Sequence, residues 1–256
     1  MSHISFSELK NWAKCPFYHK LVHIEKLKGF VGSEHTAFGT ALHEVCEKSV
    51  LGQICKGQEI DIFQKTFELE IESLIADKVE LQQSLVTEME KQGRLLAPLA
   101  VPELDRHFGN YEVISAEEKL YEPIEDNEYN FKGYIDLVIK TKDGKYHVID
   151  WKTTSWGWNA RRRSDPMVTY QLTLYKYYFA RKHNIDPKMI ETHFALLKRT
   201  AKKDSVEIFR VSSGARKTQN ALKLLNKALY NIQSKRHIKN RLSCERCEFY
   251  KTQHCR

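Results

Sequence analysis

The sequence predicts an α/β fold in which helices flank a central mixed β-sheet. The first observation is the order of elements along the chain, which runs helices, three strands, a helix, two strands and a final helix. The second is the length of 256 residues, which is enough for one large domain with a proper core. The third is a clear β-hairpin in the middle of the chain.

The N-terminal part of the chain is expected to be helical. Ser5 and Glu8 form a capping-box pattern, and Pro16 should interrupt the helix that follows it. Apolar residues at helical spacing predict a second helix over residues 38–50. Residues 59–108 also look mostly helical, with a break expected near Gly93 or Pro98.

The rest of the chain alternates between strands and helices. Apolar, β-prone runs predict strands, and Asp165-Pro166 is an N-cap followed by a first-turn proline. The expected strands cover 111–121, 133–139, 146–152, 190–197 and 206–211, and the expected helices cover 166 to about 183 and 215–232.

The central hairpin carries the most informative side chains. A three-residue turn, Lys142-Asp143-Gly144, would place Thr141 opposite Lys145 and therefore Asp136 opposite Asp150. Opposed side chains lie on one face with Cβ atoms roughly 4.5–5.5 Å apart, and Lys152 follows on that face. A two-residue turn would put the aspartates on opposite faces.

Two carboxylates this close repel each other unless one is protonated or a cation lies between them. Paired oxygen ligands favour Mg²⁺ or Mn²⁺, and a neighbouring lysine can hold a phosphate or a developing negative charge. This combination suits phosphodiester hydrolysis by metal-activated water. The alternative is a solvated hairpin face with an ordinary Asp–Lys ion pair.

Two other helical pairs could extend this site. His43 and Glu47 share a polar helix face, so His43 could complete a metal shell that Glu47 supports. Gln171 and Tyr175 share a face of the helix after the hairpin, and both can contact phosphate. The alternatives are a solvated face for the first pair and a half-buried polar edge for the second.

The cysteines suggest a second metal centre. Cys244 and Cys247 form a C-x-x-C pair, and Cys255 and Cys15 could supply two further thiolates. Four sulfurs suit either tetrahedral zinc or an iron–sulfur cluster, and would join the N-terminal helix to the tail at 236–256. His254 is an alternative to Cys255, and free tail cysteines are the other alternative.

The charge distribution indicates a polyanionic partner. The chain has 41 Lys and Arg against 33 Asp and Glu, a net charge of +8. Basic residues beside aromatic ones suit a nucleic-acid backbone with stacked bases. The candidate contacts are Trp156, Trp158, Arg161, Arg162, Arg163, Lys198 and Arg199.

The sequence has no apolar run long enough to span a membrane and no secretion signal. We therefore expect a cytoplasmic protein whose cysteines are not paired in disulfides. No Gly-x-x-x-x-Gly-Lys-Ser/Thr run occurs, so no ATP-driven motor is visible.

Taken together, these motifs resemble the RecB-like branch of the PD-(D/E)XK nuclease superfamily. The matching segments, in order, are Gly39–Glu47, Gly133–Asp136, Asp150–Thr153 and Gln171–Tyr175. The opening, from Phe6 to Pro16, is similar to the start of the iron–sulfur members, which include AddB-type nucleases and CRISPR-associated exonucleases. Seven residues separate Cys247 from Cys255, where many relatives have five.

The resemblance implies a restriction-endonuclease-like core over residues 1–256, with a helical insertion at about 52–108. It implies that His43, Asp136, Asp150 and the Trp151 carbonyl bind Mg²⁺ or Mn²⁺, and that Lys152, Gln171 and Tyr175 complete the catalytic site. A [4Fe-4S] cluster on Cys15, Cys244, Cys247 and Cys255 is expected, with Zn²⁺ as the alternative.

The activity expected from this resemblance is that of a DNA nuclease, most readily an exonuclease on single strands or duplex ends. It leaves room for a protein partner in recombination, repair or CRISPR-type adaptation. The alternatives are a non-catalytic DNA-binding module or adaptor with the same fold, and an RNA-directed nuclease.

Overall fold

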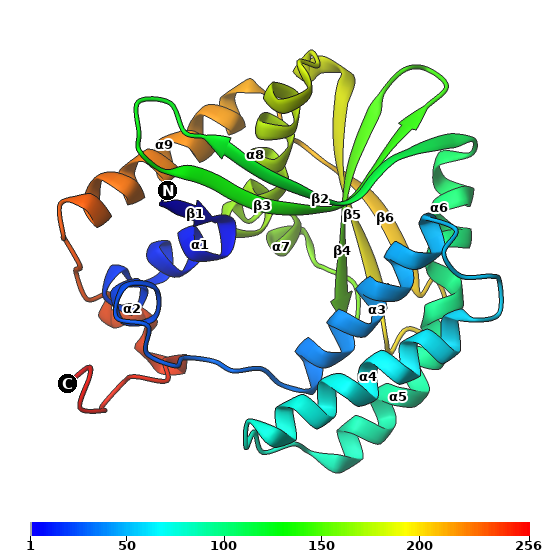
Figure 1. Cartoon of the computed structure of the whole chain (residues 1–256), viewed down its shortest axis with the longest axis horizontal. Coiled ribbons are helices and arrows are strands. Elements are labelled where there is room, and N and C mark those ends of the chain that lie inside the picture. The colour runs from blue at the N-terminus through cyan, green and yellow to red at the C-terminus, as the bar shows by residue number, and fades with distance from the viewer. Residues whose placement is uncertain (1) are drawn as a thin grey trace.

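A computed structural model describes residues 2–256 and shows a six-stranded mixed sheet with helices on both faces, as Figure 1 shows. The predicted fold class is therefore confirmed. The strands are β1 (His3–Ser5), β2 (Tyr111–Pro123), β3 (Asn130–Thr141), β4 (Tyr146–Thr154), β5 (Ile190–Lys198) and β6 (Val206–Val211). Their order is β1-β3-β4-β5-β6, and β2 pairs with β3.

The hairpin has the predicted register. Thr141 N–H donates to the Lys145 carbonyl at 3.0 Å, and Gly144 has a φ of 83°. A left-handed residue at this point is what a three-residue loop requires, and glycine adopts it without strain. The ladder continues through Lys140 opposite Tyr146 to Leu137 opposite Ile149.

One helical layer covers the face of the sheet that carries Val148 and Phe194. It consists of α1 (Phe6–Lys14), α8 (Pro166–His183) and α9 (Ala215–Gln233), with the short α7 (Ala160–Ser164) before α8. The two predicted N-caps are present, since Ser5 accepts from Glu8 N–H and Asp165 accepts from Met167 N–H. The crossover through α8 makes β4 and β5 parallel, which explains the mixed sheet.

The second helical layer packs on Ile149 and Trp151 and consists of α3 (Glu34–Val50), α4 (Glu59–Ala76), α5 (Gln83–Leu96), η2 (Ala97–Leu99) and α6 (Ala100–Phe108). The helix expected over residues 38–50 begins earlier, at Glu34, after a capping box at Ser33. The break at Pro98 is confirmed, but the turn at 77–82 was missed and Gly93 lies inside α5. A Cβ on Gly93 would lie 1.9 Å from Phe63 Cζ, so this glycine allows close helix packing rather than a break.

The N-terminal and C-terminal segments form a third, smaller cluster. It contains α2 (Pro16–His19), the π-helical turn η1 (Lys20–Ile24) and η4 (Arg241–Arg246), while η3 (Pro187–Met189) precedes β5 elsewhere in the fold. Tyr18, Leu21 and Phe249 are its buried residues. Across residues 2–256, every helix is too short or too polar to cross a lipid bilayer.

Candidate active site

The site lies where β3 and β4 separate. Their ladder ends at Leu137 and Ile149, and β4 continues to Thr154 paired only with β5 among the strands of residues 2–256. The next pair in register would be Asp136 and Asp150, so the two aspartates face each other at the point of separation. β3 and β4 diverge here, with α3 and α8 on opposite sides of the sheet (Figure 1).

Tyr175 of α8 packs against the edge of β3 at this point. A Cβ on Gly133 would lie 2.7 Å from Tyr175 Cε1, so only glycine leaves room for this ring. The Tyr175 hydroxyl is hydrogen bonded to the Tyr134 backbone and accepts from Gln171 Nε2 at 3.2 Å. Burial, followed by the charge of Asp150, raises the pKa of Tyr175, so the phenol stays protonated at neutral pH.

Asp136, Asp150 and Lys152 come together as the sequence predicted. Asp150 is 1 % exposed and forms an ion pair with Lys152 through Oδ2. Asp136 Oδ2 accepts from Trp151 N–H at 2.7 Å. A buried carboxylate pair with one lysine carries excess negative charge, which the low-dielectric surroundings make costly.

This charge imbalance appears in the proton affinities of the side chains. Burial raises the pKa of Asp136 well above its ordinary value, and the nearby Asp150 raises it further. Burial opposes the charge of Lys152, but Asp150 and Asp136 outweigh it and raise its pKa, so Lys152 remains a cation.

The donor set fits a hard divalent cation. Asp150 Oδ1 is buried and has no hydrogen-bond partner among the described residues, although such groups are normally satisfied, whereas Oδ2 is paired with Lys152. Asp136 and Asp150 supply carboxylate oxygens, which are the ligands that Mg²⁺ and Mn²⁺ prefer. A cation would both satisfy these oxygens and remove their mutual repulsion.

His43 of α3 completes this side of the site. Its Nδ1 lies 3.6 Å from Asp136 Oδ2, and the imidazole forms a hydrogen bond with the Trp151 backbone. The Trp151 carbonyl is therefore beside His43, as the metal set predicted from the sequence requires. Burial, followed by Lys152, lowers the pKa of His43, so its ring is neutral and able to ligate.

Glu117 of β2 is a site residue that sequence reasoning missed. His43, Glu117 and Asp136 have ligand atoms that all lie within 4.8 Å of one another. Glu117 adopts a φ of 49°, an uncommon conformation for this residue, next to a register shift between Val113 and Ser115. Ala116 and Glu118 pair with Leu137 and Ile135, which places Glu117 opposite Asp136; sequence reasoning predicted this strand but not its pairing with β3. Glu47 lines the same hollow as His43 and Glu117 but is not part of that group of three.

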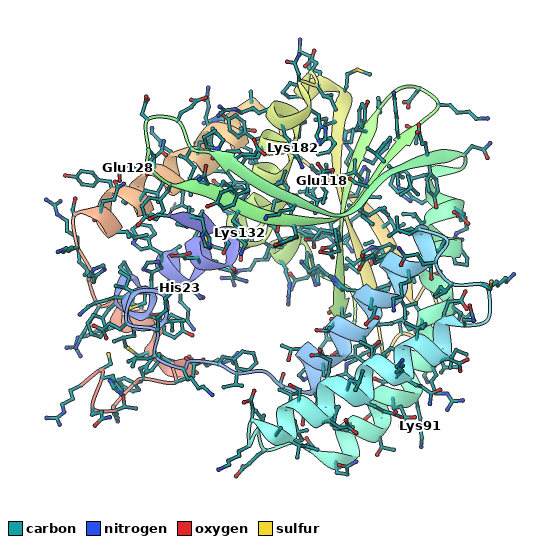
Figure 2. The ribbon with its side chains drawn as sticks, viewed as in Figure 1. His23, Lys91, Glu118, Glu128, Lys132 and Lys182 are labelled. Carbon is teal, nitrogen blue, oxygen red and sulfur yellow. The ribbon has the colours of Figure 1, made fainter. Side chains whose placement is uncertain are left out.

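Glu118 fixes the bulged strand to the helix that carries Tyr175. It accepts from Lys182 Nζ at 2.9 Å and also contacts His183, both in α8 (Figure 2). Burial opposes ionisation of Glu118, but hydrogen bonds from Ser115, His183 and Lys182 lower its pKa overall. The carboxylate is therefore charged and holds β2 and α8 together on the side of Glu117.

Lys10 of α1 is the second residue that was missed. It lines a hollow on the Tyr175 side of the site, together with Lys132, Lys152 and Gln171. Its pKa is lowered by burial and then by the positive charges of Lys152 and Arg162. Several cations therefore converge beside the carboxylates, which is an arrangement that attracts phosphate. Lys10 lies in α1, far from the hairpin in sequence, so no sequence pattern indicated that it belongs to the site.

The predicted nucleic-acid contacts separate into two groups. Trp156 is 72 % exposed, and Arg161 and Arg162 are also exposed, with the Arg162 guanidinium 4.7 Å from the centre of the Trp158 ring. Trp158, by contrast, lies in the core against Phe194, where it cannot stack on a base. Arg163 and Lys198 form ion pairs with Glu207, and Arg199 donates to Gln92 and Ser155. This second group has structural partners within the chain.

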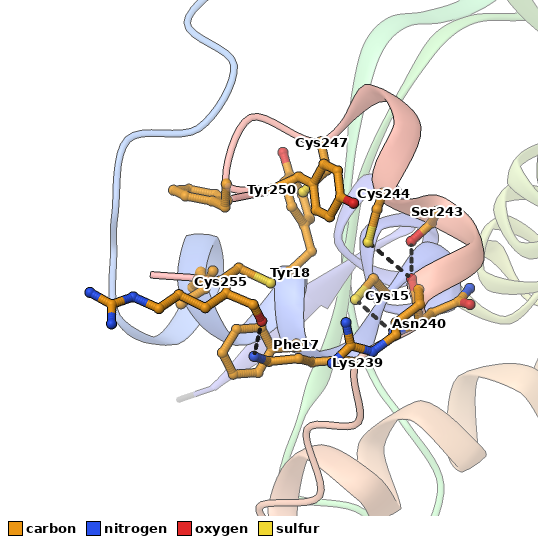
Figure 3. A pocket seen from close by; sticks show the side chains of 14 residues that line it. Cys15, Phe17, Tyr18, Lys239, Asn240, Ser243, Cys244, Cys247, Tyr250 and Cys255 are labelled. Carbon is orange, nitrogen blue, oxygen red and sulfur yellow. Dashed lines mark hydrogen bonds between the residues drawn. The ribbon is translucent and has the colours of Figure 1, made fainter. Parts of the chain in front are cut away.

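The four cysteines predicted to bind a metal centre come together where the N-terminal and C-terminal segments pack against each other (Figure 3). Cys15, Cys244, Cys247 and Cys255 line one cavity with Phe17, Tyr18, Leu21 and Phe249, whereas His254 is exposed outside it. Asn240 N–H donates to Cys15 Sγ at 3.3 Å, which links the two ends of the chain. Zinc–sulfur bonds of about 2.3 Å would bring the sulfurs within roughly 4 Å of each other. The compact ligand groups within residues 2–256 are both His–carboxylate sets, so the sulfurs are spread more widely than one zinc ion requires.

Comparison with known families shows which family the chain belongs to. A family model of the PD-(D/E)XK nuclease superfamily matches residues 3–252. The chain belongs to the PD-(D/E)XK nuclease superfamily. The fold of this superfamily is here the six-stranded sheet with its two helical layers, and Asp136 and Asp150 lie where β3 and β4 separate.

One of two similar solved structures has a TM-score high enough to show a shared fold. The crystal structure of a "Putative exonuclease" from Eubacterium rectale is similar with a TM-score of 0.62 and 14 % identity, covering 95 % of this chain and 86 % of that one. The crystal structure of SSO0001 has a TM-score of 0.38 and 15 % identity, covering 95 % and 93 % of the two chains. No curated protein matches the chain.

Proposed function

We propose that the nuclease is a Mg²⁺- or Mn²⁺-dependent deoxyribonuclease that removes nucleotides from the ends of DNA strands. The observation that carries this proposal is the pair of buried aspartates beside a charged lysine, with Asp150 Oδ1 left without a partner among the described residues. Exonuclease activity is also in line with the description of the Eubacterium rectale protein of similar fold.

The residues of this chain have separate parts in the proposed reaction. Asp136, Asp150, His43 and the Trp151 carbonyl would hold the divalent ion, with Glu117 at its edge. When bound, the ion supplies a nucleophilic water at neutral pH and neutralises charge on the phosphate. Lys152 remains protonated, so it can orient the attacking water or stabilise the phosphorane-like charge as it develops.

Substrate phosphates are proposed to lie on the Tyr175 side of the carboxylates. Lys10, Lys132 and Lys152 line this hollow, and Gln171 and the protonated Tyr175 add neutral donors. Exposed Trp156 and Arg162 lie after β4 and could extend the contact along a strand by stacking and charge. These contacts do not read base edges, so we expect weak sequence preference.

The cysteine cavity is proposed to hold a [4Fe-4S] cluster on Cys15, Cys244, Cys247 and Cys255. The wide spacing of the sulfurs supports a cluster rather than one zinc ion, and nearby Lys14, Lys239 and Arg241 would balance its negative charge. Hydrolysis needs no electron transfer, so its role would be to join the two ends of the chain.

End-labelled and circular substrates test this function most simply. Single-stranded DNA, duplex DNA, RNA and circular single-stranded DNA are incubated with Mn²⁺, with Mg²⁺ or with chelator. We expect degradation of linear DNA that requires metal and spares circles. Cleavage of circles would indicate an endonuclease, preference for RNA would change the substrate, and binding without cleavage in any metal would leave only a DNA-binding module.

A further inference from the structure

A second group of possible metal ligands lies on the opposite face of the sheet. His147 and Asp150 are three positions apart in β4, so their side chains point to opposite faces. His147 pairs in register with Glu191 of β5, and His193 follows two residues later on the same face. Alternation in two adjacent parallel strands therefore brings these three side chains together at one point.

The donor atoms converge closely. His147 Nδ1 and His193 Nε2 form a hydrogen bond of 3.1 Å, which a metal ion would replace, and His193 Nε2 lies 3.9 Å from Glu191 Oε2. The three ligand atoms all lie within 4.8 Å of one another. Zn–N and Zn–O bonds of about 2.0–2.2 Å place tetrahedral ligand atoms roughly 3.3–3.5 Å apart, so only a small movement of Glu191 is needed.

Neighbouring groups orient two of the ligands. The Thr141 hydroxyl donates to Asp143 Oδ1 at 2.5 Å, so it accepts from His147 Nε2–H at 3.0 Å. This leaves the lone pair on His147 Nδ1, directed at the group. Lys145 and Arg210 contact Glu191 Oε1 at 3.1 and 3.5 Å, which leaves Oε2 toward His193. Metal ligands are commonly fixed by such outer partners.

The surroundings keep both imidazoles neutral. His147 and His193 are 6 % and 3 % exposed, and the Phe108 ring packs against both. Burial, followed by His147 and His107, lowers the pKa of His193 to about 3. Burial likewise lowers the pKa of His147. Protons therefore do not compete with a metal ion at neutral pH.

We propose that His147, Glu191 and His193 bind one transition-metal dication of the zinc type, separate from the catalytic ion. Two imidazoles and one carboxylate suit Zn²⁺ or Co²⁺ and disfavour Mg²⁺. His147 also lines the hollow formed by His107, Phe108, Asn110 and Thr141, from which water could complete the shell. The ion would join the hairpin to β5 beneath α6, so its role is structural.

Zinc and cobalt binding to the whole protein tests this proposal. An Asp136→Asn/Asp150→Asn variant removes the catalytic carboxylates, and its remaining Zn²⁺ content and zinc-induced rise in melting temperature are measured. Co²⁺ bound by thiolates has an intense charge-transfer absorption that His and carboxylate sites lack, so the cysteine site is scored separately. His147→Asn and Glu191→Gln are added to this background, with His35→Asn, a histidine on α3, as the matched control.

We expect the double variant to bind one Co²⁺ without thiolate ligands, and zinc to raise its melting temperature by several degrees. His147→Asn should abolish both effects. Glu191→Gln should weaken the affinity for the metal at least tenfold. The His35→Asn control should keep both. Should His147→Asn fail to fold, Glu191→Gln alone decides, because it preserves size. The proposal is overturned if zinc affinity is the same with and without the Glu191 carboxylate, or if no thiolate-free ion binds.

Discussion

The proposed catalytic site and the cysteine cavity should respond to charge and to folding in opposite ways. The catalytic carboxylates sit on paired strands that fold without them, and their mutual repulsion works against the folded state. Three of the four cysteines sit on a short tail whose only buried apolar anchor, among residues 236–256, is Phe249. Losing a catalytic carboxylate should therefore cost activity and spare stability, whereas losing a cysteine ligand should cost stability first.

Lys152→Ala should have the largest effect on activity. Removing the cation that faces Asp150 should lower the cleavage rate by about 10³-fold or more, because it acts on charge that develops in the transition state. DNA affinity in chelator should change by less than about threefold, since other basic residues contribute most of it. Single-turnover cleavage and filter binding measure the two quantities. Lys132→Ala, in the same hollow, is the control and should retain cleavage within about tenfold.

Cys15→Ser should have the largest effect on stability. Metal binding contributes directly to folding free energy, so losing one ligand should lower the melting temperature by about 10 °C or more and bleach the protein. Iron and zinc content, visible absorption and thermal melting are the measurements. Cys55→Ser, at an exposed thiol outside the cavity, should change none of them. Full metal content in Cys15→Ser would refute the proposal that a metal centre joins the two ends of the chain.

His43→Ala and Glu117→Gln should have smaller, graded effects. Each removes one group from the edge of the ion site, so we expect losses of about 10- to 100-fold in cleavage at limiting metal. Loss of the nitrogen ligand should also shift the Mn²⁺/Mg²⁺ preference, because nitrogen discriminates among divalent ions differently from oxygen. Glu44→Gln is the control, since Glu44 pairs with Lys48 and Thr66. If the metal dependence of His43→Ala were unchanged, His43 would not be a metal ligand but an ordinary residue on a helix surface.

The same comparison explains what the sequence could predict. Asp136, Asp150 and Lys152 were found because one turn sets one register, and Gly144 makes that turn recognisable. Gln171 and Tyr175 followed from helical spacing. These are local rules that act over a few residues.

The residues that were missed depend on long-range geometry. Glu117 reaches the site through the pairing of β2 with β3, and Lys10 through the packing of α1 beside α8. Trp158 and Arg163 looked like surface contacts, but burial against Phe194 and pairing with Glu207 give them structural partners. The short strand β1 carries three residues and was too brief to predict.

Asp136 connects activity and stability in one side chain. Its pKa is raised in the folded protein, so the folded state binds this proton more tightly than the unfolded state does. The stabilisation is complete below the ordinary carboxyl pKa and is lost as pH rises toward the raised value. The metal-free nuclease should therefore be less stable at pH 8 than at pH 6 on account of this group, and metal binding should release a proton and strengthen with pH.

Asp136→Asn, measured for melting temperature in chelator at pH 8 and for cleavage of end-labelled DNA in Mn²⁺, tests the central claim most directly. Asn retains an oxygen that can accept from Trp151 N–H but carries no charge. We predict that cleavage falls by about 10³-fold or more while the melting temperature rises by about 2–4 °C, as expected for roughly 1 kcal/mol in a chain of this size. Cleavage close to that of the wild type, or a clear fall in melting temperature, would contradict the account.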